Sequence, residues 1–214
     1  MEVFAQFGYR RASMDQVAEA AGLTRQAVYH HFGSKEALFH AAVEALHDGA
    51  YEAAAAAGAA TEQAGKPLAD VLASQIDAKF RYIIECLEET AHVEELLSER
   101  QHQTRDLNQR FHEQAVALQV ATIERCCQRE QLALRDGMTA ADLARSIQFA
   151  IRGYNDLRLD ITALGELTAV IKLIVQGATM PLERRARSIS RSRPRHRQPS
   201  GKPARSSRHL RSSP

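Results

Sequence analysis

Residues 13 to 39, SMDQVAEAAGLTRQAVYHHFGSKEALF, constrain the fold of this chain more than any other stretch. Two short helical patterns are separated by AGLT at 21 to 24, where Gly22 can adopt the left-handed conformation that ends a helix. Thr24 can then cap a second helix, which we expect over Arg25 to Phe32. The stretch therefore predicts a helix-turn-helix.

The expected second helix has two different faces. Helical spacing puts Ala27, Val28 and Phe32 on one side, which can pack against a core. The opposite side has nothing apolar to bury, because it carries two polar i,i+4 pairs: Arg25 with Tyr29, and Gln26 with His30.

Helix caps flank this stretch on both sides. Ser13 with Gln16 matches the capping-box pattern at the start of the first helix. Ser34 can cap a longer helix expected over Lys35 to about Ala57. Residues 1 to 7 read as the end of a preceding helix, stopped by Gly8.

Composition favours an all-α fold throughout. Aromatic residues make up only 6% of the chain and tryptophan is absent, whereas good helix formers are abundant. No apolar run of eighteen residues and no export pattern occurs, so we expect no membrane association and a cytoplasmic location. The odd count of 3 cysteines, Cys86, Cys126 and Cys127, agrees with a reducing compartment.

The chain divides into three parts by composition. An alanine- and glycine-rich join at 58 to 66 separates an N-terminal helix-turn-helix domain, residues 1 to 50, from a helical domain at 51 to 182. Further helices are expected over 67 to 91, 93 to 100, 104 to 134, from Thr139 onward, and 161 to 178. The last two suggest a bundle face shared with a second copy of the chain.

Charge is distributed unevenly along the chain. Residues 183 to 214 contain eleven Lys or Arg and one acidic residue, a net of +10, so residues 1 to 182 carry the remaining seventeen basic and twenty-five acidic residues, a net of −8. The Arg-, Ser- and Pro-rich tail is expected to be disordered. It either adds sequence-independent attraction for nucleic acid or is an appendage without function.

The stretch FAQFGYRRASMDQVAEAAGLTRQAVYHHFGSKEALFHAAVEAL, residues 4 to 46, resembles the TetR family of bacterial transcriptional regulators. The resemblance joins GYxxxSM, AGLTRQAVYHHF and GSKEALF at the spacing of that family. Family members usually have about ten or more residues before the equivalent of Phe4, which complete a first helix of about three turns. Here that helix is shorter.

The resemblance implies a homodimeric regulator, most simply a repressor that a small-molecule effector releases from DNA. Two second helices about 34 Å apart would read a pseudo-palindromic operator. The residues that would meet bases or phosphates are Ser13, Thr24, Arg25, Gln26, Tyr29, His30 and Lys35.

Individual roles follow from side-chain chemistry. Arg25 can bond guanine bidentately and Gln26 can bond adenine in the same way, so these two are the expected base readers. Lys35, at a helix start, is expected to contact a phosphate. We therefore expect Gln26→Ala to change sequence preference and Lys35→Ala to weaken binding evenly, with a smaller salt dependence.

The effector pocket is predicted between the central helices of the second domain. Its apolar walls and polar anchors have plain core packing as their alternative interpretation. The candidates are Phe80, Ile83, Cys86, Leu87, Phe111, Gln114, Leu118, Phe149 and Tyr154, with Gln148 and Asn155 as further anchors.

Other classes of function have less support. We find no nucleophile, phosphate-loop or dinucleotide motif, so we expect neither an enzyme nor a cofactor. The histidines form no metal-ligand spacing, and Cys126-Cys127 is read as helix packing rather than a redox switch. Two alternatives stay open: a small-molecule or partner-binding module without productive specific DNA binding, and a tail-driven nonspecific nucleic-acid binder.

Overall fold

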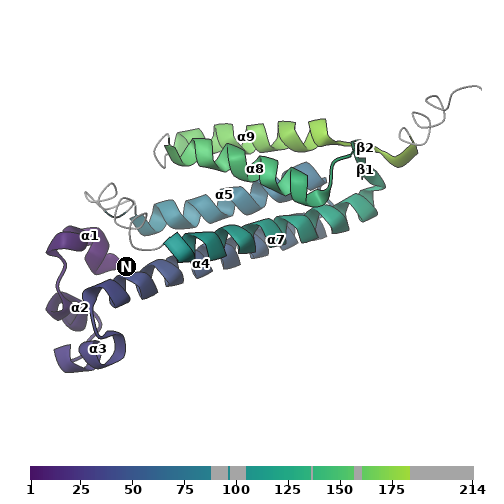
Figure 1. The fold of residues 1–214 in the computed structure, drawn as a ribbon. Helices are drawn as coiled ribbons and strands as arrows, with labels where there is room; N and C mark the ends of the chain where they lie inside the picture. Colours follow the sequence, from purple (N-terminus) through teal and green to yellow (C-terminus); the bar gives the residue numbers. More distant parts are fainter. Residues whose placement is uncertain (88–95, 97–104, 136, 157–160, 184–214) are drawn as a thin grey trace, which may run out of the picture.

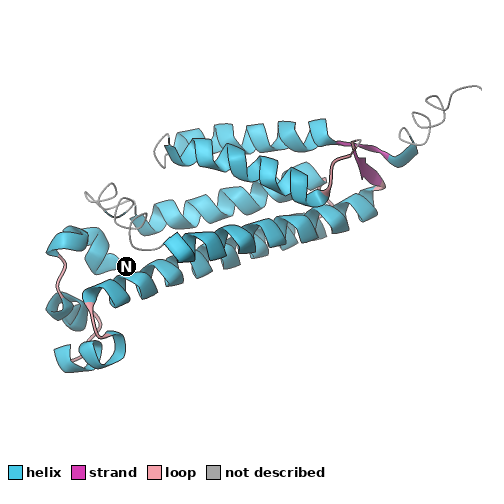
Figure 2. Ribbon diagram, in the orientation of Figure 1, coloured by secondary structure: helices cyan, strands magenta, loops and turns pink. Residues whose placement is uncertain are grey.

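The computed structural model describes residues 1–87, 96, 105–135, 137–156 and 161–183, which fold into helices and one short two-stranded sheet (Figure 1, Figure 2). The all-α class predicted from composition is confirmed, apart from that sheet. The elements in chain order are α1 (Glu2–Arg11), α2 (Met14–Ala20), α3 (Arg25–Phe32), α4 (Lys35–Gln63), α5 (Leu68–Leu87), α7 (Arg105–Glu130), β1 (Leu132–Leu134), α8 (Ala140–Asp156), α9 (Ile161–Ala178) and β2 (Thr179–Pro181).

The molecule is elongated, with α4 running along one side of the bundle (Figure 1). The small helices α1, α2 and α3 gather at the N-terminal end of α4, and the β1–β2 sheet lies at the opposite end. Helices α8 and α9 lie side by side on the face of the bundle opposite α4. We call α1 to α3 with the start of α4 the head, and α5, α7, α8 and α9 with the rest of α4 the bundle.

Local capping places the helix starts where the sequence predicts them. Ser13 forms a complete capping box with Gln16, because the Ser13 hydroxyl accepts from the Gln16 amide at 3.2 Å and the Gln16 side chain accepts from the Ser13 amide at 2.8 Å. Thr24 caps α3 and Ser34 caps α4, each accepting a backbone N–H at 3.1 Å. Gly22, with a φ of 66°, makes the predicted left-handed turn between α2 and α3.

Two expectations about the chain path were wrong. The helix expected to end at about Ala57 continues to Gln63, so most of the predicted join at 58 to 66 is helical. Gly58 is buried inside α4, where the side chain of Gln75 packs so closely that any Cβ would lie 2.6 Å from its Cγ. The glycine is therefore a helix contact rather than a flexible joint.

The second difference lies at the end of α7. The helix expected to reach residue 134 ends at Glu130, and Gln131 adopts a positive φ of 54°. Residues 132 to 134 then pair antiparallel with β2, with Ala133 opposite Met180. The strand forms because it pairs with β2, nearly fifty residues later in the sequence, and no local pattern predicts that pairing. The helix expected over 93 to 100 lies outside the described residues except for buried Leu96.

Two hydrophobic clusters hold the described residues together. The bundle cluster is built from α5, α7, α8 and α9 around fully buried residues such as Leu143, Ile147 and Ile171. The head cluster joins α1 to α4 with Leu96 and, from the far end of α5, Ile83 and Leu87. The head therefore shares its core with the second domain. No helix in the described part of the chain is long and apolar enough to cross a membrane.

Candidate DNA-binding surface and interhelical cavity

The outer face of α3 is a polar surface held by one buried anchor. Val28 is 1% exposed and fixes the helix to the head cluster. Thr24, which caps the helix, is exposed as well. The side chains that helical spacing directed outward are all exposed, as predicted: Arg25, Gln26, Tyr29 and His30.

Arg25 is oriented within this surface by two neighbours. Its Nη1 lies 3.2 Å from Oδ2 of Asp15 on α2, and its guanidinium carbon lies 5.3 Å from the centroid of the Tyr29 ring. Both members of the ion pair are more than half exposed, so the pair contributes little to stability. This arrangement keeps the planar guanidinium of Arg25 at the surface, where its N–H groups can turn toward the edge of a base.

Lys35 has a different environment from the one its position suggests. Its ammonium donates to three backbone carbonyls at the end of α1, those of Tyr9 (2.9 Å), Arg10 (3.2 Å) and Ala12 (3.1 Å). It also lies 4.8 Å from the centroid of the Tyr9 ring. All three donors of the ammonium are used inside the head, so Lys35 ties α4 to α1 in this conformation.

The residue after Lys35 strengthens the same joint. The Tyr9 hydroxyl donates to Oε1 of Glu36 at 3.2 Å. Hydrogen bonds from the backbone amide of Glu36, the Ser34 hydroxyl and Tyr9 lower the pKa of the Glu36 carboxyl, which keeps it charged at the N-terminus of α4. Ser13, another predicted phosphate contact, is engaged in its capping box.

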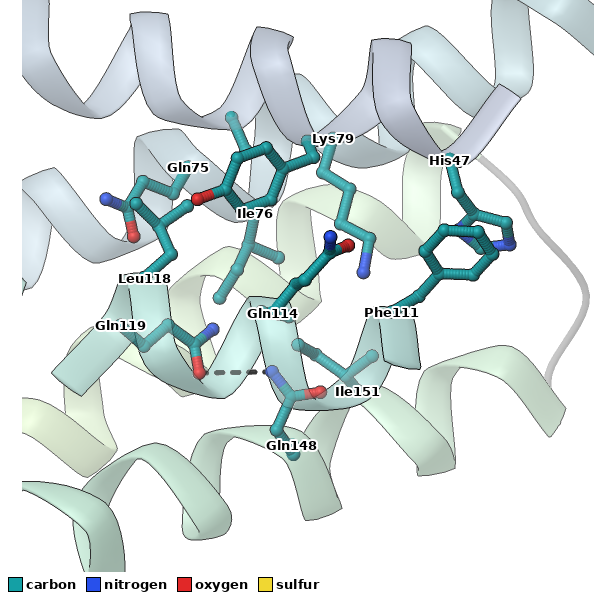
Figure 3. Close-up of a pocket in the computed structure, with 13 residues that line it drawn as sticks. His47, Gln75, Ile76, Lys79, Phe111, Gln114, Leu118, Gln119, Gln148 and Ile151 are labelled. Carbon is teal, nitrogen blue, oxygen red and sulfur yellow. Dashed lines mark hydrogen bonds between the residues drawn. The ribbon is translucent and has the colours of Figure 1, made fainter. Parts of the chain in front are cut away.

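A cavity with a mainly apolar wall lies between α4, α5, α7 and α8 (Figure 3). The space open to a water-sized molecule is about 30 Å³, room for roughly two waters. At one end the His47 ring stacks on Phe111 with ring centroids 4.1 Å apart. The lining residues are His47, Tyr51, Ala54, Gln75, Ile76, Lys79, Phe111, Gln114, Ala115, Leu118, Gln119, Gln148 and Ile151.

Three of the nine predicted pocket residues line this cavity, namely Phe111, Gln114 and Leu118, and so does the further anchor Gln148. The structure places the other six elsewhere. Phe80 and Tyr154 pack edge to face in the bundle cluster, with ring centroids 5.0 Å apart. Ile83 and Leu87 lie in the head cluster. Cys86 and Phe149 lie at the surface, and Phe149 is 68% exposed.

Sequence reasoning missed the contribution of α4 and most of the glutamines. His47, Tyr51 and Ala54 were not considered because the apolar stripe of α4 was read as core packing alone. Gln75 and Gln119 lie within amphipathic helices at positions that are buried in the structure. A glutamine at a core position of a helix is the signal that could have found them, because polar groups are rarely buried without a partner.

The cysteines in α7 have the character of packing residues. Burial raises the pKa of Cys126 to about 11 and also raises the pKa of Cys127. A thiol with a raised pKa carries less thiolate and reacts slowly. Among the described residues, no group of three or more His, Cys, Asp or Glu side chains is placed to hold a metal ion.

Comparison with known proteins gives matches at two levels. Residues 1–42 match the model of the family described as bacterial regulatory proteins, tetR family. The HTH-type transcriptional repressor Rv1474c of Mycobacterium tuberculosis is 45% identical over 38 residues, which span 18% of this chain and only 20% of that protein.

Solved structures match over most of the chain. One, from work described as "Molecular basis for control of antibiotic production by a bacterial hormones", has a TM-score of 0.59 at 23% identity and covers 84% of this chain and 93% of that one. A Mesorhizobium loti protein assigned to the TetR family of transcriptional regulators has a TM-score of 0.56 at 18% identity. This match covers 82% of this chain and 89% of that one. These likenesses concern the fold.

The described chain is thus a helix-turn-helix protein with a helical second domain, and the exposed face of α3 is the helix-turn-helix's outward surface. Residues 1–42 match the family of bacterial regulatory proteins described as the tetR family, and the described chain has the fold of solved structures such as the Mesorhizobium loti protein.

Proposed function

We propose that this protein is a homodimeric transcriptional repressor that binds a pseudo-palindromic operator and leaves it when a small molecule occupies the interhelical cavity. The observation that carries the proposal is the exposed, polar outer face of α3, whose opposite side is anchored by buried Val28 and half-buried Phe32. A helix with this division of faces is suited to the major groove, which is wide enough to admit it.

Specific contact rests on a few side chains, because residues 1 to 182 have a net charge of −8. Arg25 and Gln26 are the base readers, and Tyr29 and His30 support them on the same face. Lys35 acts by holding the head together.

Helix α4 supplies the link between the cavity and the head. Only two residues separate it from the end of α3, and its residues His47, Tyr51 and Ala54 line the cavity. The cavity is too small for a ring-sized guest, so an effector must widen it, which moves α4 relative to α7. An effector that binds the widened state better shifts the population toward it.

The exposed face of α8 and α9 is the proposed dimer surface. Large apolar side chains are exposed on it: Phe149 (68%), Leu173 (66%) and Val170 (43%). Gly153, Gly165 and Gly177 have open space where a Cβ would stand. Exposed apolar groups on adjacent helices are the usual mark of a surface that another chain covers.

Selection of bound DNA from a random pool tests the proposal directly. The full chain is expected to enrich one symmetric site with half-sites about 34 Å apart, one helical turn of DNA. A variant that ends at residue 182 is the matched control for nonspecific attraction by the basic tail. Enrichment of no sequence, or uniform retention that disappears with the tail, contradicts specific operator binding. Sedimentation of the same samples reports whether the bound species is a dimer.

A further inference from the structure

A carboxylate on α2 lies beside the single Lys or Arg residue of α3. Nη1 of Arg25 donates to Oδ2 of Asp15 at 3.2 Å. An acidic group at this place repels the phosphates of an approaching DNA, and residues 1 to 182 already carry a net charge of −8. Because both side chains are more than half exposed, the pair also adds little to stability. Asp15 therefore weakens affinity for DNA unless it helps Arg25 to read a base.

Both partners of the pair come from capped first turns of helices. Asp15 lies between Ser13 and Gln16, the two residues of the capping box that starts α2. Arg25 directly follows Thr24, whose hydroxyl accepts a backbone N–H at the start of α3 at 3.1 Å. Uncapped helix ends fray, whereas these two are fixed by hydrogen bonds. Only the two side chains remain to be ordered when the pair forms.

The pair leaves one edge of the guanidinium free. Asp15 takes Nη1 of Arg25, and neither Nε nor Nη2 has a hydrogen-bond partner within the described residues. These two nitrogens carry parallel N–H groups on one edge of the planar group, a fork that matches two neighbouring acceptors. In the major groove, N7 and O6 of guanine are such a pair of acceptors. The Arg25 side chain is 62% exposed, so a base edge can reach the fork.

Tyr29 restricts the guanidinium in a second direction. It lies one helical turn after Arg25, and the guanidinium carbon is 5.3 Å from the centroid of its ring. Asp15 therefore restrains one edge of the guanidinium, and the Tyr29 ring restrains its plane. A side chain that is ordered before binding loses less conformational entropy when it binds.

We propose that Asp15 is a positioning residue for base recognition, which holds Arg25 with its Nε and Nη2 edge free for a guanine of the operator. Asp15 touches no base itself. It lowers the affinity for all DNA through its charge and raises the preference for guanine at the base pair that Arg25 reads. The inference rests on the proposed function, since it takes α3 as the reading helix, and it adds a specificity-determining residue on α2.

Binding selection on the full chain and on three variants tests this role. Arg25→Ala first identifies the base pair, as the position of the operator where preference is lost. Asp15→Asn then removes the charge and keeps the size of the side chain. Its preference for guanine at that position, measured as the ratio of dissociation constants for the selected site and a guanine-to-adenine site, is expected to fall about threefold, the scale of an exposed ion pair. Low salt keeps weakened variants bound.

The same variant is expected to bind unrelated DNA more tightly, because a negative charge has been removed. Glu19→Gln is the matched control. Glu19 is exposed on the same helix and makes no ion pair with Arg25 in the described chain, and its replacement changes the net charge equally. This control is expected to keep the guanine preference of the unchanged protein.

A combined variant shows whether Asp15 acts through Arg25. In the Arg25→Ala background, Asp15→Asn is expected to leave base preference unchanged at every position, because the side chain that it positions is absent. Urea unfolding of Asp15→Asn is expected to show nearly native stability. A purely structural role predicts the reverse, a loss of stability with the base preference intact.

The outcomes separate this inference from the proposed function. If the unchanged protein enriches no sequence, operator binding itself is contradicted. If it enriches a symmetric site, that function stands, and the inference is overturned when Asp15→Asn keeps the full guanine preference or loses no more than Glu19→Gln. It is also overturned when Arg25→Ala alters no position, when the altered position carries a base pair without guanine, or when Asp15→Asn still changes preference in the Arg25→Ala background.

Discussion

The head and the bundle are held together by different forces. The bundle cluster is a broad apolar core shared by four helices, with fully buried residues such as Leu143, Ile147 and Ile171. The head has a small aromatic centre, in which the Phe39 ring lies 5.2 Å from Phe4 and 4.9 Å from Tyr9, together with the hydrogen bonds of Lys35. A few well-placed groups therefore decide whether the head keeps its shape.

This difference predicts which part of the molecule is more sensitive to a single mutation. In the bundle, the loss of one side chain is spread over many neighbours. In the head, Phe39 and Lys35 each join α4 to α1, so the loss of either one separates two elements. The exposed readers on α3 are expected to affect recognition while leaving both cores intact.

The largest effect is expected from Phe39→Ala, which opens a void in the head at a residue 1% exposed. Truncation of a buried Phe costs about 3–5 kcal/mol, enough to unfold the head locally and abolish operator binding. Hydrogen exchange followed by mass spectrometry should show lost protection in α1 to α3 and native protection in α8. Leu143→Ala is the control in the bundle. Equal loss of protection in both regions would show that head and bundle unfold as one unit.

Lys35→Met is expected to have the next largest effect, because it keeps the side-chain stem and removes three charged hydrogen bonds. We expect a loss of about 1.5–3 kcal/mol in the free energy of unfolding, measured with urea. Lys66→Met, at an exposed position in the turn after α4, should leave stability unchanged.

The same variant distinguishes the two roles considered for Lys35. A structural tie predicts weaker DNA binding with an unchanged salt dependence. A phosphate contact predicts normal stability and a salt slope smaller by about one.

Gln26→Ala is expected to change recognition alone. Loss of one bidentate base contact costs about 1–3 kcal/mol at the matched base pair and relaxes preference at that position. Binding selection on the variant measures this directly, and urea unfolding should show native stability. His31→Ala, exposed on the same helix but outside the predicted set, serves as the control. An unchanged preference in Gln26→Ala removes that residue from the readout.

The smallest effect is expected at Cys126. Since burial raises its pKa to about 11, the folded protein carries little thiolate there below that pH, and reactivity rises only as the pH approaches 11. Ellman's reagent at pH 8 should modify exposed Cys86 first. Cys126→Ser should leave the response of DNA binding to oxidant unchanged. Release of DNA by oxidant that this variant abolishes would establish the redox switch instead.

The parts of the fold that depend on neighbouring residues were predictable from the sequence. The caps at Ser13, Thr24 and Ser34 and the turn at Gly22 are formed within a few residues, and the structure has all of them. The exposed face of α3 was also predictable, because helical spacing alone separates it from Val28.

Features that depend on distant partners were not predictable. Gly58 reads as a joint until Gln75 is known to pack on it, and Leu132–Leu134 forms a strand only because β2 returns beside it. The bonds of the Lys35 ammonium to the carbonyls at the end of α1 were also not predictable, because no local pattern brings α1 beside the start of α4. The cavity was not predictable for the same reason, because its lining residues come from four helices. Its glutamines stand out only when the structure brings them together.

The close contact at Gly58 has a counterpart at Gly49, nine residues earlier in α4. At Gly49 the Tyr82 ring of α5 occupies the space where a Cβ would stand. Helix α5 therefore packs closely against α4 at two glycines that are nine residues apart. Because the two helices are in close contact at two points, we expect α4 and α5 to move together between Gly49 and Gly58. The first fourteen residues of α4, from Lys35 to Asp48, extend about 20 Å beyond these two contacts and pack against Ile83 and Leu87 at the end of α5. A rotation of this segment by about 10° displaces α3 by roughly 4 Å, so the end of α5 must move with the head.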